Sequence, residues 1–289
     1  MKVGIFGSDY QLDKQIQIKR VFEQLHQLDV KIWVEKGFYR YLCQQLNYEP
    51  PIEGLIETKD FDVDIALSIG GDGTFLRTAA LISSKEIPIL GINTGRLGFL
   101  ADIGPTEIED TLNDVFKNHY RIEDRTLLHL KINSQSEYHR FALNEIAVQK
   151  RDTSSMIKIN AFIDEEYLTT YWGDGLIVAT PTGSTAYSTS VNGPIIVPQA
   201  KTIVLSPIAS HSLYVRPLVV PEDSKLSLEV ESRNNNFLVA VDGRSEVFQS
   251  GMKFEIEKAA FPIKIIKRHN HTFYDTLRNK LKWGTDSRI

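Results

Sequence analysis

A glycine-rich segment with one acid in its middle, Gly70-Gly71-Asp72-Gly73-Thr74, is the part of this chain best suited to chemistry. It follows the apolar run at residues 65–69 and precedes a helix expected over residues 74–83. Glycines allow a sharp turn with exposed backbone amides, and such amides beside a helix N-terminus attract phosphate. A carboxylate repels phosphate, so Asp72 indicates a general base or a metal contact beside a phosphorylated substrate. The alternative is a plain turn in which Asp72 caps the helix.

A second glycine-containing loop, residues 91–100, follows the next expected strand. Because consecutive strands of a parallel sheet end at the same edge, the two loops can face one site. Arg77 lies one helical turn beyond Thr74. It is either a phosphate contact or a solvated helix residue.

Polar residues of a different kind gather later in the chain. Asn144-Glu145 can read sugar hydroxyls or the edge of a base, since the pair both donates and accepts hydrogen bonds. The segment at residues 173–190 opens with a second Gly-Asp-Gly and continues with small hydroxyl residues, which suit a neutral hydroxylated ligand, and with Tyr187, which could stack on a base. The alternatives are a surface turn and a Ser/Thr-rich loop. Ala209 would allow close approach of a ring, and Arg244 could contact a phosphate.

Composition limits the class of protein. The chain has 289 residues, 42% hydrophobic and 24% charged, as in a soluble globular protein of one large or two ordinary domains. A net charge of -4 gives no general case for nucleic-acid binding. The single cysteine, Cys43, excludes an internal disulfide and a cysteine-cluster zinc site, and it fits the cytoplasm. We expect neither a signal peptide nor a membrane span.

The hydrophobic period changes along the chain and indicates two domains. Residues 1–120 alternate short apolar runs with helical patterns, which predicts an α/β domain with a Rossmann-like parallel sheet. Residues 121–267 alternate with period two between turn signals, which predicts an all-β domain. The tail at residues 268–289 contains a helix over 272–283, expected to pack back onto the first domain.

Taken together, these segments resemble the NAD kinase family, whose members phosphorylate NAD to NADP. The resemblance runs from Ile69 to Arg244 in the right order. The Gly-Gly-Asp-Gly-Thr loop is shared with diacylglycerol kinases and, loosely, with 6-phosphofructokinases. The combination of Asn144-Glu145, the second Gly-Asp-Gly and the run at residues 180–187 is far more specific. The resemblance implies an α/β domain and a β-sandwich-like domain with NAD between them.

The resemblance also implies roles for individual residues. Asp72 would accept the proton of the 2′-hydroxyl of the adenosine ribose, and Tyr187 would lie against adenine. Asp174 would contact the nicotinamide end, often from a neighbouring subunit. The implied phosphate loop is Gly70, Gly71, Gly73 and Thr74. The implied NAD-binding set is Asp72, Gly73, Arg77, Asn144, Glu145, Ser155, Asp174, Thr185, Ala186, Tyr187, Ser188, Thr189, Ser190, Ala209 and Arg244.

Two positions depart from the family pattern. Trp172 stands where some bacterial relatives have Arg, and Arg244 stands where others have His or Gln. ATP would be the co-substrate, with a divalent cation, Mg²⁺, neutralising its phosphates and no dense carboxylate cage in the protein. The family association suggests a homodimer or homotetramer. The rival hypotheses are a lipid or sugar kinase that shares the loop and a non-catalytic NAD(P)-binding module.

Overall fold

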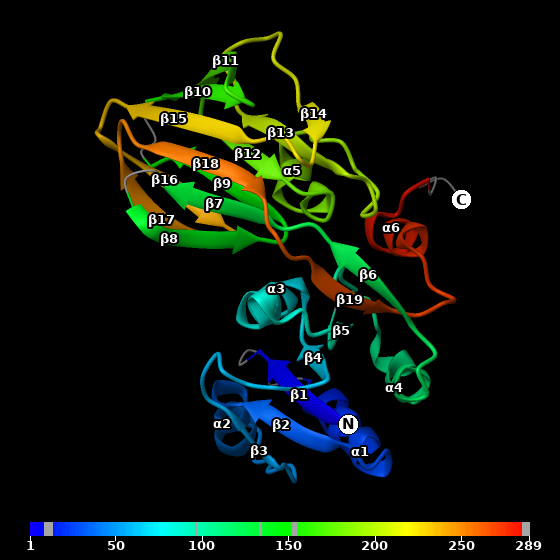
Figure 1. Ribbon diagram of the computed structural model, residues 1–289. Coiled ribbons are helices and arrows are strands. Elements are labelled where there is room, and N and C mark those ends of the chain that lie inside the picture. Colours follow the sequence, from blue (N-terminus) through cyan, green and yellow to red (C-terminus); the bar gives the residue numbers. More distant parts are fainter. Residues whose placement is uncertain (9–13, 96, 133–134, 152–154, 285–289) are drawn as a thin grey trace. The chain divides into compact units, whose positions relative to one another are not determined.

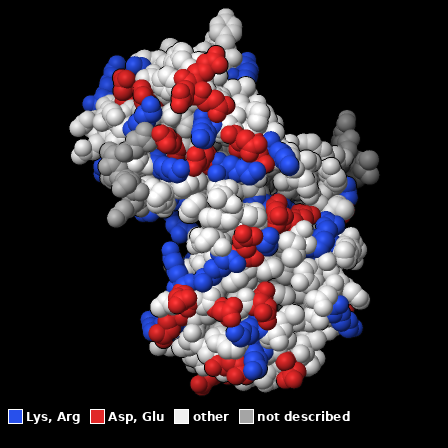
Figure 2. Space-filling model, viewed as in Figure 1, with Lys and Arg blue, Asp and Glu red and all other residues white. Residues whose placement is uncertain are grey.

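Three β-sheets organise the computed structural model, which describes residues 1–8, 14–95, 97–132, 135–151 and 155–284 (Figure 1). The chain divides into unit 1, Met1–Asp124 with Ile263–Ile289, and unit 2, Arg125–Pro262. No helix among the described residues is long and apolar enough to cross a membrane. Acidic and basic side chains are interspersed over most of the face that Figure 2 shows.

Unit 1 is an α/β unit built on one seven-stranded sheet. Its elements are β1 (Lys2–Gly7), α1 (Gln15–Gln27), β2 (Lys31–Glu35), α2 (Lys36–Gln45), β3 (Gly54–Ile56), β4 (Ile65–Ile69), α3 (Asp72–Ile82), β5 (Ile89–Ile92), α4 (Ile108–Phe116), β6 (Arg121–Arg125), β19 (Ile263–Lys267) and α6 (Phe273–Leu281). The strand order is β3-β2-β1-β4-β5-β19-β6, and each pair from β3 to β19 runs parallel. The predicted Rossmann-like α/β domain is therefore confirmed.

The sheet reverses its winding at β1 and β4. Helices α1, α2 and α4 share one buried core with β1, β2, β4 and β5, whereas α3 lies on the other face of the sheet (Figure 1). In such doubly wound sheets, ligands bind outside the carboxyl ends of the two strands where the order reverses. Those ends are Gly7 on β1 and Ile69 on β4, and Ile69 leads directly into the first glycine loop.

The chain returns to unit 1 after completing unit 2, and it does so earlier than the sequence predicts. β19 pairs with β5 through Ile265 and Ile89, and the residues Ile263, Ile265 and Ile266 are all buried. The second unit consequently ends at Pro262 rather than at residue 267, and the first unit extends to Asp124 rather than to residue 120. As predicted, α6 packs back on the first unit, where Phe273 contacts Phe99.

Unit 2 is a sandwich of two six-stranded antiparallel sheets. Their orders are β11-β10-β15-β18-β7-β8 and β14-β13-β12-β9-β16-β17, and both contribute to one hydrophobic core. The strands are β7 (Leu128–Ile132), β8 (Gln135–Ala142), β9 (Glu145–Lys150), β10 (Ile157–Ile163), β11 (Glu166–Gly173), β12 (Gly175–Ala179), β13 (Thr202–Ile208), β14 (Leu218–Pro221), β15 (Leu226–Ser232), β16 (Asn236–Val241), β17 (Arg244–Gln249) and β18 (Lys253–Lys258). The helical turns η4 (Gly183–Thr185) and α5 (Tyr187–Ser190) follow β12.

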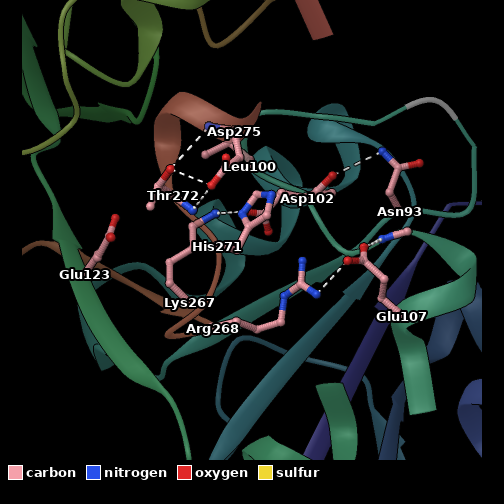
Figure 3. Close-up of polar contacts among 12 residues, drawn as sticks. Asn93, Leu100, Asp102, Glu107, Glu123, Lys267, Arg268, His271, Thr272 and Asp275 are labelled. Atoms are coloured by element: carbon pink, nitrogen blue, oxygen red, sulfur yellow. Dashed lines mark hydrogen bonds and ion pairs between the residues drawn. The ribbon is translucent and has the colours of Figure 1, made fainter. Parts of the chain in front are cut away.

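A buried ion-pair cluster fixes the end of the second glycine loop to the returning segment (Figure 3). Asp102 lies 2.6 Å from Lys267 Nζ at the end of β19 and 3.3 Å from His271 Nδ1. Burial is the largest influence on Asp102 and opposes its charge. The charge of Lys267 and the hydrogen bonds from His271 and Lys267 together outweigh burial and lower the pKa of Asp102 to about 2. Nearby, Arg268 pairs with Glu107 at 2.7 Å.

We expect Asp102→Asn to destabilise unit 1, because it leaves the buried Lys267 ammonium without its carboxylate partner. Removing one partner of a buried pair costs about 3–5 kcal/mol. The loss would be measured as the change in the free energy of unfolding in urea. The control is Glu57→Gln, which breaks the exposed Lys36–Glu57 pair and should cost at most about 1 kcal/mol. Equal losses in the two variants would contradict the assigned role.

Candidate active site

The first glycine loop places Asp72 at the start of α3 but not as its cap. The N-cap is Gly71, which has no side chain that could cap the helix, and Asp72 is the first helical residue. The alternative in which Asp72 serves as the N-cap is therefore wrong. Gly70 has a φ of 151°, a backbone region that glycine enters readily and other residues avoid. The loop turns sharply there, between the buried strand β4 and the helix.

The Asp72 carboxylate binds three successive backbone amides of the second glycine loop. Oδ2 accepts from Phe99 N at 2.9 Å, and Oδ1 accepts from Leu100 N and Ala101 N at 3.0 Å each. The two loops are thus in contact at the edge of the sheet, as the sequence predicts. Hydrogen bonds from three fixed amides orient the carboxylate and hold it in place.

Asn93 and Gly98 complete this arrangement. The buried Asn93 side chain donates to Ala101 O at 3.2 Å and accepts from Gly95 N at 2.6 Å, which joins the two ends of the loop. A Cβ added to Gly98 would lie 2.0 Å from Asp72 Oδ1 and 2.9 Å from Ala101 O. Only glycine therefore fits beside the carboxylate. Arg96 of this loop lies outside the described residues.

The remaining residues of the first loop present bare backbone. A Cβ on Gly71 or Gly73 would meet no described atom within 4 Å, and both residues are exposed. Thr74, by contrast, is buried and belongs to the first turn of α3. Open backbone at a helix N-terminus suits an approaching phosphate. Arg77 instead donates a hydrogen bond to Gly7 O at the end of β1, so part of its guanidinium braces the strand.

In unit 2, Asp242 holds the Asn144-Glu145 pair. Its carboxylate accepts from Leu143 N and Asn144 N at 2.8 Å each and from Glu145 N at 3.2 Å. Asp242 and Gly243 form the two-residue turn between β16 and β17, with φ values of 47° and 79°. Positive φ at both positions is the backbone that Asp-Gly hairpins prefer.

Glu145 is a buried carboxyl with unused hydrogen-bonding capacity. It is 8% exposed, and its Oε2 has no hydrogen-bond partner within the part of the chain that the structure describes. Burial is the largest cause that raises the pKa of Glu145, and the negative charge of Asp242 is the second. A hydrogen bond from the Tyr187 amide acts in the opposite direction, and the resulting pKa is about 7. A ligand that donates to this oxygen would satisfy it.

The segment from Thr180 to Ser190 packs directly on this pair. Thr180 donates from N to Asn144 O at 2.9 Å and from Oγ1 to Leu143 O at 2.6 Å. A Cβ on Gly183 would lie 2.1 Å from Asn144 O, so glycine is needed for this contact. The sequence-predicted binding residues Asn144 and Glu145 are thus brought next to the hydroxyl-rich run.

Most hydroxyls of this run are used within the protein. Thr185, Thr189 and Ser190 donate to backbone carbonyls of their own turns, and Ser188 pairs with the buried Ser206 hydroxyl at 3.0 Å. The Tyr187 hydroxyl accepts from Gln149 Nε2 at 2.7 Å, and Tyr187 is 36% exposed. The run therefore mainly builds the shape of the turn that carries Ala186 and Tyr187.

The other predicted binding residues are more dispersed. Asp174 lies between β11 and β12 and pairs with Lys150 at 2.6 Å. Ala209 has a φ of 42°, and its carbonyl oxygen would be 2.9 Å from a Cβ on Gly173. Ala209 therefore lies close to the residue that directly precedes Asp174. Arg244 is exposed and follows the Asp242 turn, where its charge acts on the Asp242 carboxyl. Ser155 precedes β10, which belongs to the sheet of unit 2 that does not contain β17 and Arg244.

Sequence reasoning missed the residues that position this machinery. Asp242 had a usable signal, because Asp-Gly between two alternating strands predicts a tight hairpin. Asn93 had one too, because an Asn side chain often accepts from the amide two residues on. Lys280 had none, since its contact joins segments distant in sequence. Lys280 Nζ lies 3.1 Å from Asp72 Oδ2. No group of three or more His, Cys, Asp and Glu in the described ranges could hold a metal ion.

We expect Gly98→Ala to destabilise the protein, because the added methyl group must displace Asp72 or the Ala101 carbonyl. Overpacking of this kind costs about 1–3 kcal/mol. Gly95→Ala in the same loop is the matched control, since the nearest described atom to its Cβ, Asn93 Oδ1, would be 3.8 Å away. Urea unfolding of both variants makes the comparison, and a Gly98→Ala protein as stable as Gly95→Ala would show that the loop yields freely.

We expect Glu145→Gln to make stability less dependent on pH. The folded pKa of about 7 lies above the ordinary glutamate value of 4.5, so the wild-type protein loses stability as pH rises through this window. The variant should match wild type at pH 5 and exceed it by about 2 kcal/mol at pH 8.5. Urea unfolding at both pH values measures this, and a pH-independent difference would contradict it.

Comparison with known proteins places both units in one family. The model of the ATP-NAD kinase N-terminal domain matches residues 3–120, and that of the C-terminal domain matches residues 143–268. The NAD kinase of Bacteroides fragilis is 50% identical over 290 residues, with each chain covered completely.

Solved structures share the fold. A yeast NADH kinase, in a complex with NADH, superposes with a TM-score of 0.90 at 24% identity, over 100% of this chain and 89% of its own. An NAD kinase from Archaeoglobus fulgidus, in a complex with ATP, superposes with a TM-score of 0.77 at 27% identity, over 98% of this chain and 99% of its own. The two domain models match in order and a full-length relative is half identical, so this chain belongs to the ATP-NAD kinase family.

Proposed function

We propose that this chain transfers the γ-phosphoryl group of ATP to the 2′-hydroxyl of the adenosine ribose of NAD, which yields NADP and ADP. The observation that carries the proposal is Asp72, a carboxylate fixed by three amides at the first turn of a helix beside open glycine backbone. A base beside a phosphate cradle is what phosphoryl transfer to a hydroxyl requires.

Unit 1 would handle the phosphates. The exposed backbone of Gly71 and Gly73 and the N-terminus of α3 would contact the phosphates of ATP, with Gly70 and Thr74 shaping the turn. Asp72 would accept the proton of the attacked hydroxyl. Because Arg77 donates to Gly7 O, it would act first as a brace at the end of β1, and its other N–H groups could reach a phosphate.

Unit 2 would recognise the nucleoside. The unsatisfied Glu145 oxygen suits a donor on the ligand, either a ribose hydroxyl or the amino group of adenine. Asn144 is adjacent and buried, and the exposed ring of Tyr187 would stack on adenine. Thr185, Ala186, Ser188, Thr189 and Ser190 would shape this part of the site, and Ser155, Asp174, Ala209 and Arg244 stay predicted contacts.

A divalent cation would accompany ATP. Both Asp72 oxygens are already hydrogen-bonded, and the described residues offer no carboxylate cage. These residues fit Mg²⁺ that is carried mainly by the phosphates and its own waters, the mode this ion prefers in kinases. The cation would neutralise the charge of the transferring group. Cytoplasmic location and a homodimeric or homotetrameric state stay predictions.

The rival functions differ in the reaction observed. A lipid or sugar kinase would phosphorylate diacylglycerol or fructose 6-phosphate, and it would not explain the Asn144-Glu145 pair packed against Tyr187. A binding module would hold NAD without forming NADP. Incubation of the purified chain with ATP, Mg²⁺ and each acceptor, followed by chromatographic detection of the product, separates the three.

We expect Asp72→Asn to lower kcat by about 10²-fold or more, because the amide cannot accept the hydroxyl proton. NAD affinity measured by calorimetry should stay near the wild-type value, since NAD recognition is assigned mainly to unit 2. The matched control is Asp110→Asn, which changes an exposed acid in the first turn of α4 and should leave kcat unchanged. Wild-type turnover in Asp72→Asn would reject the general-base role.

A further inference from the structure

The C-terminal helix delivers a lysine to the proposed general base. Lys280 Nζ lies 3.1 Å from Asp72 Oδ2, although the two residues are 208 positions apart in the sequence. The same ammonium group lies 4.7 Å from the centre of the Phe99 ring. Phe99 is also the residue whose amide binds Asp72 Oδ2. The lysine is therefore part of the surroundings of Asp72.

Packing fixes the helix that carries this lysine. The Thr272 hydroxyl caps α6 through Asp275 N, and Thr276 and Leu277 are buried. Phe273 contacts Phe99 with ring centres 6.0 Å apart. The segment just before the helix is fastened by the Asp102 cluster through Lys267 and His271. A partly exposed ion pair adds little to stability, so stability does not explain why the fold brings Lys280 here.

The donors around Asp72 are not equivalent. Three are backbone amides that the loop holds in place, and the fourth is an ammonium on a flexible chain whose side chain is 32% exposed. For Asp72 to accept a proton from a hydroxyl, one oxygen must become available to that hydroxyl. Lys280 is the donor that can move away without rearranging the backbone.

We propose that Lys280 is a further catalytic residue, whose ammonium moves from Asp72 to the transferring phosphoryl group. This inference rests on the proposed kinase function. An attacking hydroxyl that is hydrogen-bonded to Asp72 Oδ2 places its oxygen within about 6 Å of Lys280 Nζ, since each lies about 3 Å from that same oxygen. The γ-phosphorus bonds to that oxygen, so the phosphoryl oxygens come within reach of a rotating lysine side chain.

The 2′-oxygen forms a bond to the γ-phosphorus while the bond from that phosphorus to the oxygen bridging to the β-phosphate breaks, and ADP leaves. The hydroxyl proton passes to Asp72. The ammonium keeps its proton and stabilises the negative charge on the phosphoryl oxygens. In the empty site it also partly neutralises Asp72, so the carboxylate repels an incoming phosphate less.

Lys280→Met tests the proposal, because Met keeps an unbranched apolar chain against Phe99 and removes only the charge. We expect kcat to fall by about 10²- to 10³-fold, the usual cost of losing one donor to a transition-state oxyanion. The KM for NAD and the melting temperature should stay at wild-type values. Lys280→Arg should recover part of the activity. The matched control is Arg278→Met, which removes a basic side chain from the same helix. Arg278 pairs with Asp275 instead of Asp72, so this variant should keep the wild-type kcat.

A second comparison separates contact with phosphate from a positioning effect on Asp72. In an Asp72→Asn background, Lys280→Met should lower the residual kcat further if Lys280 acts on the phosphoryl group. If the residual kcat falls no further in that background, the proposal is overturned. It is also overturned if Lys280→Met alone keeps the wild-type kcat. If the wild-type chain itself forms no NADP from NAD and ATP, the kinase function fails instead, so the two failures are distinguishable.

Discussion

The hydrogen bonds from Phe99, Leu100 and Ala101 to the Asp72 carboxylate are the interaction on which the rest of unit 1 depends. A carboxylate on a glycine turn would otherwise be free to rotate and would repel phosphate. Three fixed amides remove that freedom and keep the acid at one place beside the α3 N-terminus. They also join the loops that follow β4 and β5, which makes one site of two strand ends.

This arrangement explains why the chain returns to its first unit. The amides that bind Asp72 end at Ala101, and the next residue, Asp102, is anchored to Lys267 and His271. The carboxyl-terminal end of the loop is thus fixed twice, by the proposed base at residues 99–101 and by the returning segment at Asp102. A tail built only to finish the sheet would need β19 alone, whereas this tail continues with His271, which also contacts Asp102, and with the helix that carries Lys280.

The sequence predicts the parts of this site that local pattern determines. The glycine loop after β4, the second loop after β5 and the period-two strands of unit 2 all follow from spacing. The strand β6 is not predicted, because four of its five residues are charged and no apolar alternation marks it. β19 is apolar, but nothing local tells that it pairs with β5 rather than within unit 2. The contact between Arg77 and the Gly7 carbonyl could not be predicted for the same reason, since the two residues are 70 positions apart.

The acid of each unit that is assigned to the proposed reaction has its own kind of surroundings, and the difference matches the task of each. Asp72 accepts hydrogen bonds from three backbone amides and from the Lys280 ammonium, which hold its carboxylate in place. Glu145 is buried beside a second carboxylate with one oxygen unsatisfied, which raises its pKa to about 7. A ligand donor would relieve that penalty and favour the charged form of Glu145. An analogue without the donor would leave the buried oxygen unpaired, so unit 2 would discriminate by the cost of an unmade hydrogen bond.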